Sequence, residues 1–139
     1  PVAQIDPVQF NQALTLNVLA PQAMLAAFDP LLKRSGSGRV IALTSSVGAQ
    51  PRAYWGAYGA TKAALENLLA SYGQEVARIS GTRVAIVDPG ATRTQMRARA
   101  YPGEDPAIVK SPQVVAERIV ALLTEDFATG YRERVETTA

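Results

Sequence analysis

The chain has 139 residues, 47% of them hydrophobic, which is enough for one domain with a moderate core. Its 14 basic and 12 acidic side chains leave a net charge of +2, which gives nucleic-acid binding little support; the absence of cysteine excludes disulfides, and the absence of histidine as well argues against a zinc site. No apolar run approaches the roughly 20 residues of a membrane span and no signal-peptide pattern opens the sequence, so we expect a cytoplasmic protein without nucleic-acid, membrane or metal partners.

The first helix is predicted to begin after Asp6. Aspartate caps the free N–H groups of a helix and proline fits its first turn, so Asp6-Pro7 is a typical helix start. Apolar residues then recur at helical spacing toward Leu32, and the pattern stops at a Ser-Gly-Ser-Gly turn. Pro21 lies inside this stretch and cannot donate a helical hydrogen bond, so we expect a kink near Asn17.

Two strands and a second long helix follow. Residues 39–44 and 83–87 are short apolar runs, which are typical of buried strands. Between them, residues 54–79 repeat apolar side chains at helical spacing and end at Ser80-Gly81. The core face of this helix is predicted to carry Leu65, Leu68, Leu69, Tyr72, Val76 and Ile79.

The last third of the chain predicts a loop, a helix and a strand. Residues 90–110 contain two prolines and several charges, which is consistent with a long mobile loop over a site. Ser111 and Pro112 are typical of a helix start, and residues 131–135 predict a short strand at the edge of the sheet. Helices alternate with strands throughout, which indicates an α/β fold with a parallel sheet. The apolar face of the last helix is expected to carry Val115, Ile119, Leu122 and Leu123.

Tyr58 and Lys62 are the first candidates for chemistry. Four residues apart, they share one face of the predicted helix, where an ammonium can favour the phenolate and bring its pKa toward neutrality. Tyr58 would then be a proton donor and acceptor. Alternatively, the pair is a half-buried tyrosine beside a lysine that reaches solvent.

Hydroxyl residues follow both predicted strands. Ser45 and Ser46 come directly after strand 39–44, and strand 83–87 is followed by Pro89-Gly90 and, shortly after, by Thr92 and Thr94. The carboxyl ends of parallel strands lie at one edge of a sheet, where ligands bind in open α/β folds. An ordinary strand-end hydroxyl bonded to backbone is the alternative for each.

In this order, Asn17, Ser45, Tyr58, Lys62 and Pro89-Gly90-x-x-x-Thr94 closely resemble the short-chain dehydrogenase/reductase family. The resemblance runs from Asp6 to about Val135. It implies a doubly wound, Rossmann-type parallel sheet, an NAD or NADP cofactor and the interconversion of an alcohol and a carbonyl. Trp55-Gly56-Ala57-Tyr58, with Val47-Gly48 after the serines, resembles a bacterial oxidoreductase subgroup within the family.

One departure from the family is large. Members open with a strand, a glycine-rich turn and a helix that receives the cofactor pyrophosphate, and no G-x-G-x-x-G occurs here. We therefore expect residues 1–139 to be the C-terminal part of one such domain, with the glycine-rich half outside this sequence, either as a fragment, as part of a longer polypeptide or as a truncated product. Such a half, alone, is expected to expose Leu65, Leu69 and Val87 and to self-associate or be partly disordered.

The resemblance implies a role for each catalytic candidate. Tyr58 would exchange the proton, while Ser45 would stabilise the substrate oxygen, with Ser46 as the alternative should the intervening loop be one residue shorter. Lys62 would lower the pKa of Tyr58 and bind the nicotinamide ribose. Asn17 would accompany a helix kink whose free carbonyl holds a water that leads protons to Lys62.

The remaining candidates lie around the cofactor and substrate. The resemblance places the turn at Pro89 and Gly90, with Thr92 and Thr94, beside the nicotinamide. Trp55 would line the substrate site together with Ser45 and Ser46, although aromatic packing in the core is an equal alternative. The arginines at the start of the 90–110 segment could meet an anionic substrate or simply face solvent.

The expected function is that of an NAD(P)-dependent oxidoreductase. An alternative is a non-catalytic half-domain that serves oligomerisation, because the two helices that pair in family dimers correspond to residues 6–32 and 54–79. A homodimer or homotetramer is expected through these helices. The sequence predicts neither the substrate nor the choice between NAD and NADP.

Overall fold

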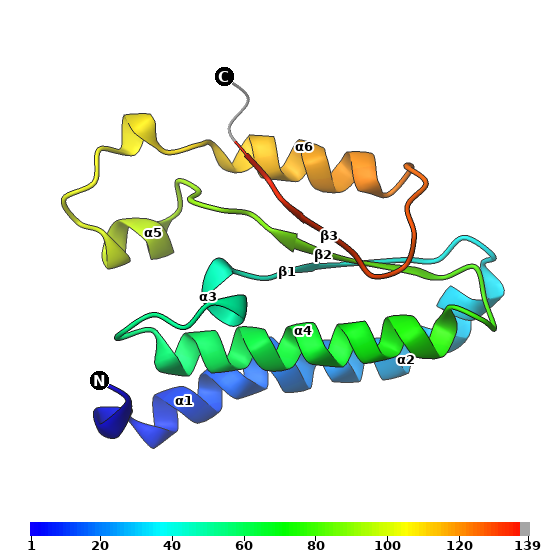
Figure 1. Ribbon diagram of the computed structural model, residues 1–139, viewed down its shortest axis with the longest axis horizontal. Coiled ribbons are helices and arrows are strands. Elements are labelled where there is room, and N and C mark those ends of the chain that lie inside the picture. The colour runs from blue at the N-terminus through cyan, green and yellow to red at the C-terminus, as the bar shows by residue number, and fades with distance from the viewer. Residues whose placement is uncertain (137–139) are drawn as a thin grey trace.

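A parallel sheet of three strands in the order β1-β2-β3 organises the computed structural model, which describes residues 1–136 (Figure 1). Helices α2 and α4 cover one face of the sheet and α6 covers the other, as the α/β prediction requires. Arg39 pairs with Arg83 and Ala85 with Tyr131 in the strand register. The elements are η1 (Val2–Gln4), α1 (Pro7–Leu14), η2 (Thr15–Leu19), α2 (Ala20–Arg34), β1 (Arg39–Leu43), α3 (Ser46–Ala49), α4 (Gly56–Val76), β2 (Arg83–Asp88), α5 (Gln95–Ala100), η3 (Pro106–Ile108), α6 (Pro112–Leu122) and β3 (Tyr131–Arg134).

The first long helix is interrupted where the sequence predicts a kink. Asp6 caps α1 by accepting a hydrogen bond of 2.8 Å from the backbone N–H of Val8. A π-helical turn, η2, then separates α1 from α2, and the N–H of Ala20 reaches back five residues to the carbonyl of Thr15. Pro21 has no N–H to donate to the carbonyl of Asn17, so the wider turn relieves a bond that an α-helix could not make.

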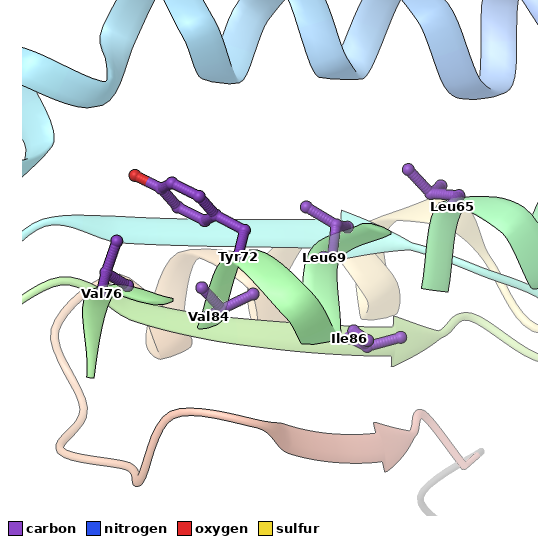
Figure 2. Close-up of a cluster of buried hydrophobic side chains, with 6 residues drawn as sticks. All are labelled: Leu65, Leu69, Tyr72, Val76, Val84 and Ile86. Carbon is purple, nitrogen blue, oxygen red and sulfur yellow. The ribbon is translucent and has the colours of Figure 1, made fainter. Parts of the chain in front are cut away.

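The core between α4 and the sheet confirms most of the predicted helix face, but Leu68 is half-buried and lies outside the cluster. Leu65, Leu69, Tyr72 and Val76 of α4 pack with two residues of β2 (Figure 2). Ile79, by contrast, is 67% exposed, because α4 ends at Val76 and Ile79 lies in the turn that follows. The β2 residues in this cluster are Val84 and Ile86.

A second apolar cluster joins the opposite face of the sheet to α6. Ala85 and Val87 of β2 contact Val115 and Leu122 of α6, and all four are buried. Ser111 caps α6 by accepting from the N–H of Gln113, as predicted. Leu123, predicted on the core face, is half exposed because α6 ends at Leu122. The four central residues of β2 are therefore all buried, and their side chains alternate between the two faces of the sheet.

The expectation that Leu65, Leu69 and Val87 would be exposed in this segment is wrong. They are 5%, 2% and 0% exposed, because α4, β2 and α6 already cover one another. Exposed apolar side chains occur on several elements, and some of them lie together beside the edge strand β1. A groove of about 460 Å³ runs there between β1, α2 and α4, and its wall includes Leu16, Met24, Phe28 and Leu43, each more than 40% exposed.

The segment from 90 to 110 is more ordered than the predicted loop. It holds α5, which Thr94 caps by accepting from the N–H of Arg97, and η3, which Asp105 caps in the same way. Both caps are local hydrogen bonds that the proline and charge content concealed. Within residues 1–136, every helix falls short of the length and apolarity that a membrane crossing needs.

Candidate active site

Tyr58 and Lys62 occupy the first two turns of α4, beside the carboxyl end of β1. The Nζ of Lys62 donates a hydrogen bond of 3.0 Å to the carbonyl of Leu43, the last residue of that strand. The same Nζ lies 5.7 Å from the centroid of the Tyr58 ring. The lysine thus ties α4 to the strand end and places its ammonium over the phenol ring.

The pKa of Tyr58 shifts in the direction opposite to the sequence expectation. Burial of the half-buried phenol raises the pKa of Tyr58, the hydroxyl of Ser45 lowers it, and the negative charge of Asp88 raises it further. Burial is thus the largest influence on this pKa, while the ammonium of Lys62 donates its hydrogen bond to the carbonyl of Leu43. Tyr58 is consequently protonated at neutral pH, as a proton donor must be.

The pKa of Lys62 is lowered. Burial of the ammonium is the main cause, and the carboxylate of Glu66, one helical turn further along α4, opposes it. Of the described residues, only Leu43 accepts a hydrogen bond from this ammonium. An ammonium carries three N–H groups, so two remain for a ligand.

The two serines differ in their backbone and in their neighbours. Ser45 is extended, with φ −157° and ψ 150°, and precedes α3, whereas Ser46 is the first residue of that short helix. The hydroxyl of Ser45 is close enough to Tyr58 to influence its pKa. This geometry favours Ser45 over Ser46 as the partner of Tyr58, although both line a cavity of about 270 Å³ at the strand ends.

Asn17 reaches the site through a residue that the sequence did not single out. Its Nδ2 donates a hydrogen bond of 3.0 Å to Oγ1 of Thr61, and this hydroxyl donates one of 2.8 Å to the carbonyl of Tyr58. Thr61 is completely buried. The π-helical turn that carries Asn17 is therefore bonded directly to the turn of α4 that carries Tyr58.

The turn after β2 is shaped by local hydrogen bonds. Gly90 has φ +63°, a conformation that glycine adopts without strain, and its N–H donates 2.9 Å to Oδ1 of Asp88. The hydroxyl of Thr92 donates to the carbonyl of Pro89 at 3.2 Å. Thr94, as the cap of α5, already binds a backbone N–H. A Cβ atom at Gly90 would lie 3.0 Å from the Nζ of Lys110, so a side chain at this position would displace the lysine.

Trp55 links Tyr58 to the 90–110 segment. Its ring lies edge-on to Tyr58 at 6.0 Å between centroids and is stacked on Tyr101 at 6.1 Å. Arg52 donates a hydrogen bond of 2.9 Å to the Tyr101 hydroxyl. Trp55 thus packs against two aromatic rings outside both core clusters, and its place at the substrate site stays a prediction.

Arg97 is already paired and is not a free receptor for an anionic substrate. Its guanidinium donates to both carboxylate oxygens of Glu104, at 2.7 and 2.6 Å, and lies 3.7 Å above the ring of Tyr101. The Glu104 carboxylate raises the pKa of Arg97. Together these contacts fasten α5 to the residues that follow it.

Sequence reasoning missed a second set of residues at the same strand end. Thr44 donates a hydrogen bond to the carboxylate of Glu66, and this carboxylate also accepts one from Arg132 on β3. Thr44 and Glu66 are both buried. The only signal in the sequence is that Glu66 lies four residues after Lys62, on the same face of the helix.

Comparison with known proteins settles the family. A family model described as short chain dehydrogenase matches residues 1–105. The chain belongs to the short-chain dehydrogenase family. It is 36% identical over 126 residues to the Escherichia coli K12 protein named uncharacterized oxidoreductase YciK, a match that covers 91% of this chain and 49% of that protein.

Solved structures agree with this assignment. A short chain dehydrogenase from Salmonella enterica serovar Typhi superposes with a TM-score of 0.91 at 34% identity, over 99% of this chain and 57% of that one. A putative short chain dehydrogenase from E. coli CFT073, in complex with NADPH, superposes with a TM-score of 0.90 at 35% identity, over 99% of this chain and 57% of that chain. The Rossmann-type prediction is confirmed. The chain spans about half the length of the curated relatives it matches, and its assignment to the C-terminal part of the domain stays a prediction.

Proposed function

We propose that this chain is the C-terminal part of an NAD(P)-dependent oxidoreductase that interconverts an alcohol and a carbonyl by hydride transfer. The observation that carries the proposal is the convergence of Ser45, Tyr58 and Lys62 at the carboxyl end of β1, in a chain that belongs to the short-chain dehydrogenase family. The relative from E. coli CFT073 in complex with NADPH supports the choice of cofactor class.

The residues at this edge fit a nicotinamide cofactor. Lys62 has two N–H groups left for ribose hydroxyls, and the turn after β2 has no side chain at Gly90, whose positive φ suits glycine. Backbone near Thr92 and Thr94 completes the proposed contact. A bound nicotinamide cofactor supplies or accepts the hydride. The pyrophosphate would be held outside this segment.

Tyr58 is the proposed proton donor in the reductive direction. Its raised pKa keeps the hydroxyl protonated at neutral pH, so the proton is held until negative charge develops on the substrate oxygen. Ser45 donates to the same oxygen and stabilises that charge. Ser46 and Trp55 would border the substrate, Ser46 from α3 and Trp55 from the residue before α4.

Asn17 and Lys62 restore and position the donor. The bonds from Asn17 to Thr61 and from Thr61 to the Tyr58 carbonyl fix the first turns of α4, which supports a positioning role for Asn17. The carbonyl left free by Pro21 in the π-helical turn could hold the water through which protons return toward Lys62. Both roles follow from the interrupted helix.

A non-catalytic half-domain is the second candidate. The exposed apolar side chains of Met24 and Phe28 on α2 favour it, because faces of this kind need a partner. The partner would be the rest of the domain or another copy, paired through residues 6–32 and 54–79 as a homodimer or homotetramer. Catalysis and oligomerisation are separable by assay.

The test uses the longest natural polypeptide that contains this chain. NADPH and NADH are titrated by calorimetry, and a panel of aldehydes and ketones is then assayed by loss of absorbance of the reduced cofactor. The proposal expects binding of at least one cofactor and reduction of at least one carbonyl. Oligomers that bind neither cofactor would instead support the half-domain.

A further inference from the structure

Three consecutive residues at the end of β1 each contact a different turn of α4. The carbonyl of Leu43 accepts from Lys62, and the hydroxyl of Ser45 acts on Tyr58. Between them, the hydroxyl of Thr44 donates to Glu66. The three partners on α4 are spaced by four residues, so they lie on one face of the helix. We refer to these three contacts, 43 to 62, 44 to 66 and 45 to 58, as the strand–helix ladder.

Glu66 is the buried end of this ladder. Glu66 is only 8% exposed, yet its carboxylate has two partners, the hydroxyl of Thr44, directly after β1, and the guanidinium of Arg132 on β3. A buried carboxylate is stable only when it is paired and hydrogen-bonded. Glu66 therefore joins α4 to the end of β1 and to β3.

We propose that Glu66 is a positioning residue, which holds the Thr44–Ser45 strand end against α4 and sets the charge environment of Lys62, with Arg132 as its counter-ion. The inference rests on the proposed function for its catalytic consequence. The proposed effect of Glu66 on the charge environment of Lys62 does not depend on catalysis and can be tested without an enzyme assay. Glu66 touches neither substrate nor cofactor in this scheme and acts through Ser45 and Lys62.

Glu66 lines the cavity at the strand ends together with Asp88 of β2 and with Arg132, Glu133 and Arg134 of β3. Lys62 lines the groove beside β1, where the other charged residue is Arg39. Glu133 is bound to Arg118 at 2.7 Å, and Arg134 lies 3.6 Å from the Asp88 carboxylate. Arg132 is the cation paired with Glu66, and its side chain is 49% exposed. Removing Glu66 or Arg132 therefore changes the field at Lys62 with opposite signs.

The electrostatic test measures the pKa of Lys62 in the full natural polypeptide by ¹³C NMR of reductively methylated lysines, with Lys62→Arg to assign the signal. Glu66→Gln removes the negative charge that opposes the effect of burial, so the pKa of Lys62 falls further. Arg132→Gln leaves Glu66 uncompensated, so the pKa of Lys62 rises. Glu75→Gln, an exposed glutamate on the same helix, is the control and leaves it unchanged.

The positioning test measures carbonyl reduction. Thr44→Val removes the hydroxyl with nearly the same volume and should lower kcat by about 10- to 100-fold, as small displacements of catalytic groups do. Thr44→Ser keeps the hydroxyl and should restore kcat, which a merely volumetric role of Thr44 would not require. Binding of the cofactor by calorimetry should be the same in both variants.

These results separate the two proposals. Shifts of opposite sign in Glu66→Gln and Arg132→Gln support the electrostatic role even if no carbonyl is reduced, a result that would overturn only the proposed function. Because Arg132 is half exposed, its variant remains informative if Glu66→Gln fails to fold. An unchanged pKa of Lys62 in Arg132→Gln would overturn the role of Glu66. A Thr44→Val enzyme with full kcat would overturn it as well.

Discussion

The junction of β1 with α4 and the segment around α5 are held together in different ways. At the junction, the hydrogen bonds join residues far apart in sequence: Asn17 to Thr61 spans 44 positions and Lys62 to Leu43 spans 19. Around α5, the hydrogen bond from Arg97 to Glu104 spans only 7. Tyr101 supplies the contacts from this segment to the junction, through Trp55 and Arg52.

This contrast suggests that the junction serves the chemical step and that the α5 segment selects the substrate. The junction depends on strand and helix positions that the whole sheet fixes, so a change there should affect every substrate equally. The α5 segment is stabilised mostly by itself and can vary without disturbing the sheet, which is typical of segments that select substrates. The predictions below test this division.

The largest effect is expected for Tyr58→Phe. The substitution removes one hydroxyl and leaves the ring contacts with Trp55, so fold and cofactor binding should persist. The rate of carbonyl reduction should fall by roughly 10²- to 10⁴-fold for every substrate, as for other losses of an acid catalyst. Steady-state kinetics with circular dichroism as the folding control measures this. A folded variant with near-normal turnover would contradict the role of Tyr58.

Ser45→Ala is expected to lower kcat by about 10²-fold, as for loss of one donor to a developing oxyanion. Ser46→Ala is the matched control and should cost much less, since Ser46 lies within α3. Stopped-flow measurement of the hydride-transfer step compares the two. The reverse order of effects would assign the role to Ser46.

Tyr101→Leu should change selectivity rather than chemistry. It removes the ring that stacks on Trp55 and lies beneath Arg97, so the wall of the substrate site should open. The expected result is a change of about 10-fold in the ratio of kcat/KM between bulky and small carbonyls, a typical value for one pocket contact. Tyr54→Leu, at an 82% exposed position, is the control. Equal losses for all substrates would place Tyr101 in the chemistry.

The smallest effect concerns Tyr72, far from both regions. Burial, followed by the hydrogen bond of 2.9 Å to Asp29, raises the pKa of Tyr72 to about 12. Because this pKa is raised in the folded state, its contribution to stability is complete below the ordinary value of about 10 and is lost as the pH rises from there to about 12. The difference between the ultraviolet titrations of the unsubstituted protein and Tyr72→Phe should show one tyrosinate with a raised pKa, because the raised pKa of Tyr58 is common to both. A normal titration would contradict this burial.

Local signals in the sequence predicted much of the fold. Asp6 and Ser111 cap their helices as expected, and the apolar spacing of Leu65 to Val76 found the core face of α4. The prediction that Ile79 lies on the core face was wrong, because apolar spacing does not reveal where a helix ends. The α5 helix was not predicted, because it is stabilised by one cap and one ion pair, which composition does not reveal.

The site was predictable as a set of residues but not as an electrostatic system. Motif order brought Ser45, Tyr58 and Lys62 forward, and the structure places them together. The raised pKa of Tyr58 depends on burial, which four residues of sequence do not encode. The pairing of Glu66 with Arg132 spans 66 positions, so only the register of β3 brings the two side chains into contact.

Transfer of deuterium from C4-deuterated NADPH or NADH tests the central claim most directly. The full natural polypeptide is incubated with each labelled cofactor and a panel of carbonyl compounds, and the products are analysed by mass spectrometry. The account predicts an alcohol that carries one deuterium on its carbinol carbon, and a rate of labelling lowered by roughly 10²- to 10⁴-fold in Tyr58→Phe. A folded protein that binds the cofactor but transfers no deuterium to any carbonyl, or a Tyr58→Phe variant that labels the product at the normal rate, would contradict it.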